Sequence, residues 1–219
     1  MQRRNFICMA LAGAATTATT AAAQGAPQGA QGASAPVLLV LGDSLSAEYG
    51  IARGSGWVAL LERRLAEKGR AVRIVNASIS GDTTSGGRRR LAALLARHKP
   101  AVLVVELGSN DALQGTPLDT TRANLASIVQ AGKAAGARVL LTGQQMPPNY
   151  GEDYAARFAA LFGEVAKAEG AALVPFFLKG VADSAEPLSL FQSDGLHPLA
   201  AAHPIILDNV WAHLEALLP

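Results

Sequence analysis

Short apolar runs alternate with longer amphipathic stretches along most of the chain. The apolar runs are rich in branched residues, as expected of strands that are buried on both faces of a parallel sheet. Strands are expected over residues 37–41, 72–76, 101–107, 138–142 and 172–176. Helical spacing predicts helices over residues 57–68, 118–135, 154–168 and 199–218, and one more that ends near residue 98. Because strands and helices alternate throughout, the sequence predicts an α/β fold with a five-stranded parallel sheet and helices on both sides.

The composition agrees with one folded domain. Of the 219 residues, half are hydrophobic and 16% are charged, which allows a sizeable core and excludes wholesale disorder. The formal net charge of +2 is too small to indicate a nucleic-acid partner. The run Arg88-Arg89-Arg90 is interpreted as a solvated helix turn and not as a phosphate-binding group.

Residues 1–23 have the features of a secretory signal peptide. A positive start at Arg3-Arg4 precedes an apolar centre over residues 6–15. Ala21-Ala22-Ala23 then offers a cleavage site before Gln24. The apolar centre is too short for a permanent membrane anchor, so a periplasmic or secreted protein is expected. Arg3-Arg4 also resembles a twin-arginine signal, which leaves two export routes open.

The remaining chain divides into a linker and the folded domain. Residues 24–35 are mostly Gly, Ala, Gln and Pro, typical of a flexible linker, and residues 36–219 form the domain. Because the single cysteine, Cys8, lies in the leader, no disulfide and no cysteine metal site are expected. A nucleotide cofactor is not expected either, since the glycines of residues 81–86 are followed by Gly87-Arg88 where a P-loop needs Lys and Ser/Thr.

A serine follows the first strand directly. Gly42-Asp43-Ser44 forms a polar turn at the carboxyl end of that strand, where open α/β sheets place their ligands. Ser44 is therefore a candidate nucleophile. Taken alone the feature is ambiguous, because Gly-Asp-Ser is also an ordinary turn composition.

The loop before the last helix contains a possible base for Ser44. Acyl transfer by serine needs a base within hydrogen-bond reach of the hydroxyl and a carboxylate that orients the base. His197 can be the base, and Asp194, three residues earlier, can reach its other ring nitrogen. The alternative is that Asp194 only caps the following helix. The remaining histidines, which have no such neighbour and are interpreted as structural or solvated, are His98, His203 and His213.

Acyl transfer also needs donors for the oxyanion that forms on the substrate carbonyl. The turns after the second and third strands offer the backbone N–H of Gly81 and the side-chain amide of Asn110. Each residue alone is an ordinary turn former. Their position at strand ends, together with Ser44 and His197, points to a serine hydrolase.

Four blocks of the sequence resemble those of the SGNH (GDSL-type) hydrolases. They are Gly42-Asp43-Ser44-Leu45-Ser46, Gly81, Gly108-Ser109-Asn110-Asp111 and Asp194-Gly195-Leu196-His197. The sequence around these blocks, from about Val37 to the last helix, is similar to that of the bacterial periplasmic arylesterase and acyl-CoA thioesterase/lysophospholipase branch. Ser109 departs from that branch, which more often has a second glycine there.

The resemblance implies a flavodoxin-like three-layer α/β/α fold, no metal, and hydrolysis through an acyl-enzyme. It implies that Ser44 is the nucleophile, His197 the general base and Asp194 its orienting carboxylate. The oxyanion hole would consist of the backbone N–H groups of Ser44 and Gly81 and the amide of Asn110. The α/β-hydrolase motif Gly-x-Ser-x-Gly is absent from the sequence, which argues against that fold.

The expected substrate is a small-molecule ester or thioester of an acyl chain. The expected pocket walls are the loops 112–117 and 146–150, and the candidate substrate-binding residues are Leu113, Met146, Pro147 and Tyr150. Packing of these loops onto the sheet edge is the alternative. A carbohydrate acetylesterase (deacetylase) of the same superfamily is a second hypothesis, and a periplasmic binding protein without turnover is a third. Nothing in the sequence requires more than a monomer.

Overall fold

Five parallel strands form one sheet in the order β2-β1-β3-β4-β5. The computed structural model describes residues 35–146 and 150–219, so the expected leader, nearly all of the expected linker and Pro147 lie outside the described residues. The strands are β1 (Val37–Gly42), β2 (Arg73–Asn76), β3 (Val102–Glu106), β4 (Arg138–Thr142) and β5 (Ala172–Val174). Gly42 pairs with Glu106 and Val40 with Asn76, so β1, β2 and β3 end close to one another.

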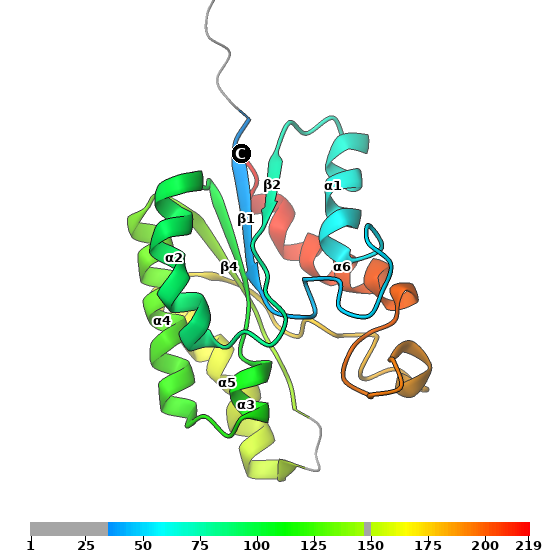
Figure 1. Ribbon diagram of the computed structural model, residues 1–219. Coiled ribbons are helices and arrows are strands. Elements are labelled where there is room, and N and C mark those ends of the chain that lie inside the picture. Colours follow the sequence, from blue (N-terminus) through cyan, green and yellow to red (C-terminus); the bar gives the residue numbers. More distant parts are fainter. Residues whose placement is uncertain (1–34, 147–149) are drawn as a thin grey trace, which may run out of the picture. The chain divides into compact units, whose positions relative to one another are not determined.

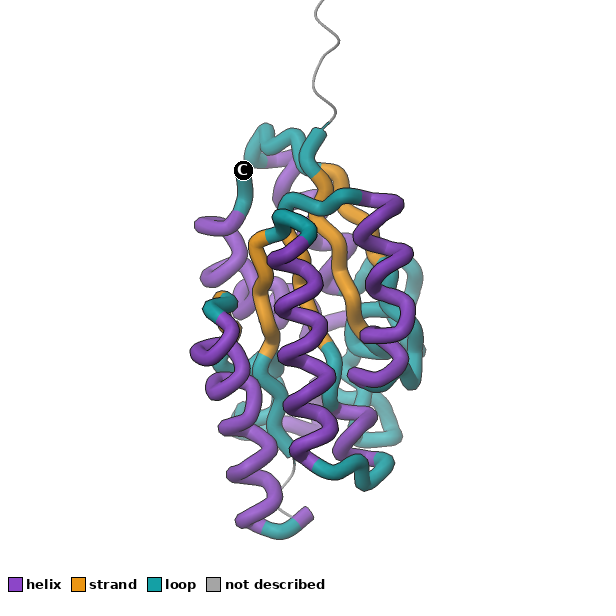
Figure 2. The backbone as a smooth tube through the Cα atoms, turned by 90° about the vertical axis from the view of Figure 1, so that its left-hand side faces the viewer, coloured by secondary structure: helices purple, strands orange, loops and turns teal. Residues whose placement is uncertain are grey.

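Helices cover both faces of this sheet (Figure 1). The α-helices of the described residues are α1 (Trp57–Glu67), α2 (Thr84–His98), α3 (Ser109–Leu113), α4 (Leu118–Ala134), α5 (Glu152–Glu169) and α6 (His203–Leu214). The helices α2, α4 and α5 cover one face, and Figure 2 shows them from outside, in front of the strands. The helices α1 and α6 contact each other on the opposite face. The three-layer α/β/α fold expected from the sequence is confirmed.

Each face of the sheet has its own buried core, because alternate strand residues point to opposite sides. Leu39 and Leu41 of β1 pack with the α2, α4 and α5 side, and Leu38 and Val40 pack with the α1 and α6 side. On the second side, His203 is buried, and its Nδ1 accepts the N–H of Trp57 at 3.0 Å. This contact joins the starts of α6 and α1, in line with a structural role for His203.

Prolines and a glycine account for most differences from the expected elements. The strand β5 ends at Val174, before Pro175, because proline has no N–H for the sheet. The single helix expected over residues 199–218 is divided into a 3₁₀ turn Ala200–Ala202, α6 and a 3₁₀ turn Glu215–Leu217. Pro204 lies in the first turn of α6, where its missing N–H costs nothing.

The short helix α3 occupies a segment that the sequence predicted as a polar turn. Gly108 precedes it with φ of 125°, a conformation that favours glycine, and the change of direction lets Asn110 lie in the first turn of the helix. Among the described residues, no helix has both the length and the apolar character needed to cross a membrane.

Candidate active site

Ser44 lies in the turn that follows β1, at the carboxyl ends of the strands. The turn is held by the backbone, since the N–H of Ala47 donates to the carbonyl of Asp43 at 3.0 Å. The side chain of Asp43 accepts the N–H of Leu45 at 3.1 Å. Ser44 itself is half-buried, and its hydroxyl faces the loop that contains His197.

The structure brings Ser44, His197 and Asp194 together as the sequence predicted. The Oγ of Ser44 is 2.9 Å from Nε2 of His197. The Nδ1 of the same ring is 2.7 Å from Oδ2 of Asp194. A carboxylate at Nδ1 favours the tautomer with its proton on Nδ1, which leaves the lone pair of Nε2 directed at the serine hydroxyl.

The backbone keeps Asp194 ionised. Its Oδ1 accepts the N–H of Leu196 at 2.9 Å and that of His197 at 3.0 Å. These two N–H groups, His197 first, lower the pKa of Asp194 to about 2, with a further contribution from the His197 ring. Gly195, with φ of 67°, allows the chain to curl back around the carboxylate.

The loop of His197 is tied to the turn of Ser44. The Nε2 of Gln192 donates to the carbonyl of Tyr49 at 2.9 Å, and the N–H of Gln192 donates to the carbonyl of His197 at 2.7 Å. The ring of Tyr49 lies against the imidazole of His197, with centroids 4.4 Å apart. Two segments that are 143 to 153 residues apart in the sequence are thus held next to each other.

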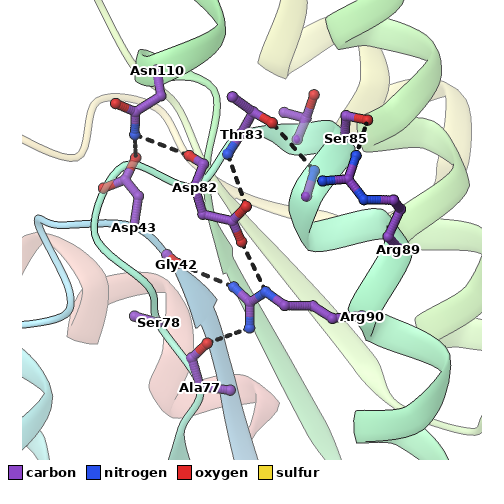
Figure 3. A network of polar contacts seen from close by, with 12 residues as sticks. Gly42, Asp43, Ala77, Ser78, Asp82, Thr83, Ser85, Arg89, Arg90 and Asn110 are labelled. Carbon is purple, nitrogen blue, oxygen red and sulfur yellow. Dashed lines mark hydrogen bonds and ion pairs between the residues drawn. The ribbon is translucent and has the colours of Figure 1, made fainter.

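The two predicted oxyanion donors outside the Ser44 turn, Asn110 and Gly81, differ in their surroundings. The side-chain amide of Asn110 donates to Oδ2 of Asp43 at 3.0 Å and to the carbonyl of Asp82 at 2.9 Å (Figure 3). Both amide protons therefore have acceptors within the protein. Gly81 has φ of 78° in the exposed turn after β2, and it adjoins the Asp82 carbonyl that Asn110 contacts.

A cavity of about 420 Å³ opens next to Ser44. Asn110 and His197 contribute to its lining, as do the predicted wall residues Leu113 and Met146. Gly81 and Tyr150 are not among the lining residues, and Tyr150 is exposed. Within residues 35–146 and 150–219, no group of three or more His, Cys, Asp or Glu side chains is arranged to hold a metal ion.

A large part of the cavity wall comes from a segment that the sequence analysis missed. The apolar side chains that follow β5 and face the cavity are Phe176, Leu178, Ala182, Pro187, Leu188 and Phe191. They follow no regular period, because most of this segment is irregular, with one 3₁₀ turn at Pro187–Leu190. The apolar character of these residues is the feature of the sequence that indicates a cavity wall, since an irregular loop rich in Phe and Leu must cover a core or a ligand.

A pair of buried carboxyl groups lies behind Ser44 and was also missed. Glu106, at the end of β3, and Asp43 are almost fully buried. The Oε2 of Glu106 accepts the hydroxyl of Ser46 at 2.7 Å, and its Oε1 accepts the amide of Gln144 at 3.0 Å. The sequence feature that indicates this buried group is Glu106 itself, a single charged residue inside the apolar run of residues 101–107.

Burial sets the charge of this carboxyl pair. Desolvation is the largest cause for both groups and raises the pKa of Asp43 to about 6 and that of Glu106 well above its usual range. The negative charge of Asp43 raises the pKa of Glu106 further, whereas the nearby His197 lowers that of Asp43. The N–H of Asp43 donates to Oε2 of Glu106 at 3.4 Å, and burial together with the nearby Asp43 carboxylate favours the protonated form of Glu106.

Comparison with known proteins agrees with this geometry. Esterase TesA of Pseudomonas aeruginosa is 53% identical over 188 residues, which cover 86% of this chain and 92% of the relative. Thioesterase 1/protease 1/lysophospholipase L1 of Escherichia coli K12 is 41% identical over 186 residues, 85% of this chain and 86% of the relative. A crystal structure of TesA matches with a TM-score of 0.80 over 83% of this chain and 99% of that chain.

The family model extends over nearly the whole described domain. The model of the GDSL-like lipase/acylhydrolase family matches residues 40–205, from within β1 to the first turn of α6. That range includes Ser44 at its start and His197 near its end. This protein is therefore a member of the GDSL-like lipase/acylhydrolase family and an ester-hydrolysing enzyme.

Proposed function

We propose that this enzyme is a serine hydrolase that cleaves carboxylic esters and thioesters of acyl chains through an acyl-enzyme on Ser44. The observation that carries the proposal is the unbroken contact from Asp194 to Nδ1 of His197 (2.7 Å) and from Nε2 to Ser44 Oγ (2.9 Å). This contact lies at the edge of a mainly apolar cavity.

In the acylation step, Nε2 of His197 takes the proton of Ser44 as Oγ forms a bond to the substrate carbonyl carbon. The carbonyl π electrons move to its oxygen. When the tetrahedral intermediate collapses, the bond to the alcohol or thiol breaks, and the leaving group takes the proton from Nε2. Water then repeats the sequence on the acyl-enzyme and releases the carboxylic acid. Asp194, ionised at neutral pH, stabilises the imidazolium that forms in both steps.

The oxyanion is assigned to the N–H groups of Ser44 and Gly81 and to the amide of Asn110. Asn110 already donates to Asp43 and to the Asp82 carbonyl, so an oxyanion must replace one of these acceptors. Burial raises the pKa of Glu106 and so favours its protonated form, which reduces the negative charge of the carboxyl pair behind this position. That reduction favours a transition state in which a new negative charge develops.

The cavity favours an acyl chain over a small acetyl group. Its lining from Leu113, Met146 and the segment after β5 is mostly apolar. Each methylene that such a wall removes from water contributes about 0.8 kcal/mol. The printed names of the relatives, an esterase and a thioesterase/lysophospholipase, support the same substrate class.

Two measurements test the proposal. A phosphonate ester inhibitor should label Ser44, and Ser44→Ala should remove nearly all ester hydrolysis with little change in the thermal midpoint. Labelling of another serine would overturn the assignment. With nitrophenyl esters, kcat/KM should rise from acetyl to a medium chain, and thioesters should also be cleaved. A sharp maximum at acetyl, with release of acetate from acetylated sugars, would favour the deacetylase.

We further propose that residues 1–23 are removed during export to the periplasm or the medium. The support is the sequence of the leader, with Arg3-Arg4 at its start and Ala21-Ala22-Ala23 at its end. Mass spectrometry of the exported protein should give an N-terminus at or near Gln24. A cytosolic protein that keeps Met1 would contradict this expectation.

A further inference from the structure

Arg90 differs from its two neighbours in the run Arg88-Arg89-Arg90. Arg88 and Arg89 are exposed on α2, as the sequence analysis expected. The side chain of Arg90 is only 21% exposed, so the interpretation of a solvated turn is wrong for this residue. Arg90 instead extends toward the carboxyl ends of β1 and β2 (Figure 3).

The guanidinium of Arg90 contacts three groups that belong to different parts of the chain. Its Nε is 2.8 Å from Oδ2 of Asp82, and this ion pair is largely shielded from water. Its Nη1 donates to the carbonyl of Ala77, and its Nη2 donates to the carbonyl of Gly42 at 3.3 Å. A planar guanidinium with fixed donors suits such a three-way contact, whereas a lysine ammonium does not reproduce it.

Two of these three groups, Gly42 and Asp82, adjoin residues assigned to the oxyanion hole. Gly42 is the last residue of β1 and lies two positions before Ser44. Asp82 follows Gly81 directly, and the carbonyl of Asp82 accepts the amide of Asn110 at 2.9 Å. One arginine side chain therefore connects the turn of Ser44, the turn of Gly81 and the acceptor that orients Asn110.

The local structure leaves room for this arrangement. A Cβ on Gly86 would lie 1.7 Å from Oδ1 of Asp82, so the absence of a side chain there lets the carboxylate lie against the start of α2. The same Oδ1 accepts the N–H of Thr83 at 3.0 Å. Asp82 is thus fixed from both of its oxygens, and the turn of Gly81 is fixed with it.

We propose that Arg90 is a positioning residue for the oxyanion hole, which it aligns by tying Gly42, Ala77 and Asp82 together. This proposal rests on the proposed function, because it needs an oxyanion held by Ser44, Gly81 and Asn110. The contacts of Arg90 are made in the substrate-free protein, so its contribution is preorganisation of the donors. A misplacement of catalytic groups by about 1 Å costs on the order of 100-fold in rate.

The test compares Arg90→Lys and Arg90→Ala with the wild-type enzyme on a nitrophenyl ester. Both variants should lower kcat by about 10- to 100-fold while KM stays within about threefold, because the donors act on the transition state and not on bound substrate. Asp82→Asn, which removes the ion pair without a change in α2, should give a smaller loss of the same kind. Arg89→Lys is the matched control, since Arg89 is exposed and contacts only Ser85 among the hydrogen bonds found in the described residues, and it should change neither constant.

Two results would overturn the proposal. One is a kcat of Arg90→Lys and Asp82→Asn equal to that of the wild type, and the other is an effect confined to KM. Circular dichroism identifies a variant that does not fold, and Asp82→Asn then decides, because it leaves the helix and its arginine in place. Ser44→Ala in the same assay distinguishes a failure of the positioning role from a failure of the proposed function. If Ser44→Ala is inactive and Arg90→Lys is normal, only the positioning role is wrong; if Ser44→Ala stays active, the proposed function is wrong as well.

Discussion

Glu106→Gln tests the charge of the carboxyl pair behind Ser44. Burial raises the pKa of Glu106 well above its usual range, so there is a pH range in which the folded protein keeps a proton that the unfolded chain releases. One extra proton in the folded state lowers the free energy of unfolding by about 1.4 kcal/mol for each pH unit above the unfolded pKa. Glutamine has nearly the same shape and does not ionise, so the variant is free of this cost.

The sign and the size of the effect follow from this linkage. A carboxyl group whose pKa is raised by folding stabilises the protein most below its unfolded pKa, and the stabilisation is lost as the pH rises toward the folded pKa. As the pH rises from the unfolded pKa of Glu106 toward its raised folded pKa, the wild type should progressively lose unfolding free energy relative to Glu106→Gln. The hydroxyl of Ser46 loses one acceptor in the variant, which adds a constant offset and leaves the slope unchanged.

The raised pKa of Asp43 contributes to the stability of both proteins. This carboxyl faces Glu106, His197 and Asp82, of which His197 lowers the pKa of Asp43 and Asp82 raises it. Glutamine at position 106 has nearly the same shape as glutamate and leaves the burial of Asp43 nearly unchanged. The contribution of Asp43 therefore largely cancels in the difference between the two proteins.

The assay is urea unfolding at several pH values, followed by tryptophan fluorescence, to which the buried Trp57 and the partly buried Trp211 contribute. The Nε1 of Trp57 donates to Ser46 Oγ at 3.0 Å, so this probe reports on the same region as Glu106. Glu62→Gln on the exposed face of α1 is the control, because it removes a carboxyl group that is not buried. If the difference in unfolding free energy between the wild type and Glu106→Gln does not change from weakly acidic to neutral pH, the folded protein does not hold an extra proton on Glu106.

Three further predictions concern activity. Asn110→Ala should lower kcat by on the order of 10²–10³-fold with a smaller change in KM, as measured with nitrophenyl esters, and an effect on KM alone would make Asn110 a substrate-binding residue. Asp194→Asn should be less damaging to kcat than His197→Ala, because Asp194 orients the ring and does not itself transfer the proton. Leu178→Ala should lower kcat/KM about 10-fold for a medium-chain ester and leave the acetyl ester nearly unchanged, since it removes apolar surface from the cavity wall; equal losses on both esters would contradict that placement.

The sequence predicted the strands and the Ser44, Asp194 and His197 cluster because each depends on local information. A buried parallel strand needs a continuous apolar run, and β1 and β3 both have one. Ser44 and His197 each follow from a short motif with a definite chemistry. The cavity wall after β5 has no such local rule, because Phe176 lines the cavity whereas the adjacent Phe177 is buried in the core. Only the packing of that segment decides which side chain faces the substrate.

Glu106 and Arg90 show where a prediction from sequence stops for a physical reason. The partner of Glu106 is Asp43, 63 residues away, so the protonated state depends on two strands being adjacent. For Arg90, the helical period indicates a direction toward the sheet, which the basic composition of the run Arg88-Arg89-Arg90 does not indicate. Residues three and four apart share one helix face, and Gly86 and Gly87, which lie four and three positions before Arg90, are buried. The arginine that follows a buried glycine pair at this spacing is directed toward the sheet, and its charge is stable there only because Asp82 is held at the same place. Each residue of a basic run on a helix therefore has to be assigned separately to the buried or the exposed face of that helix.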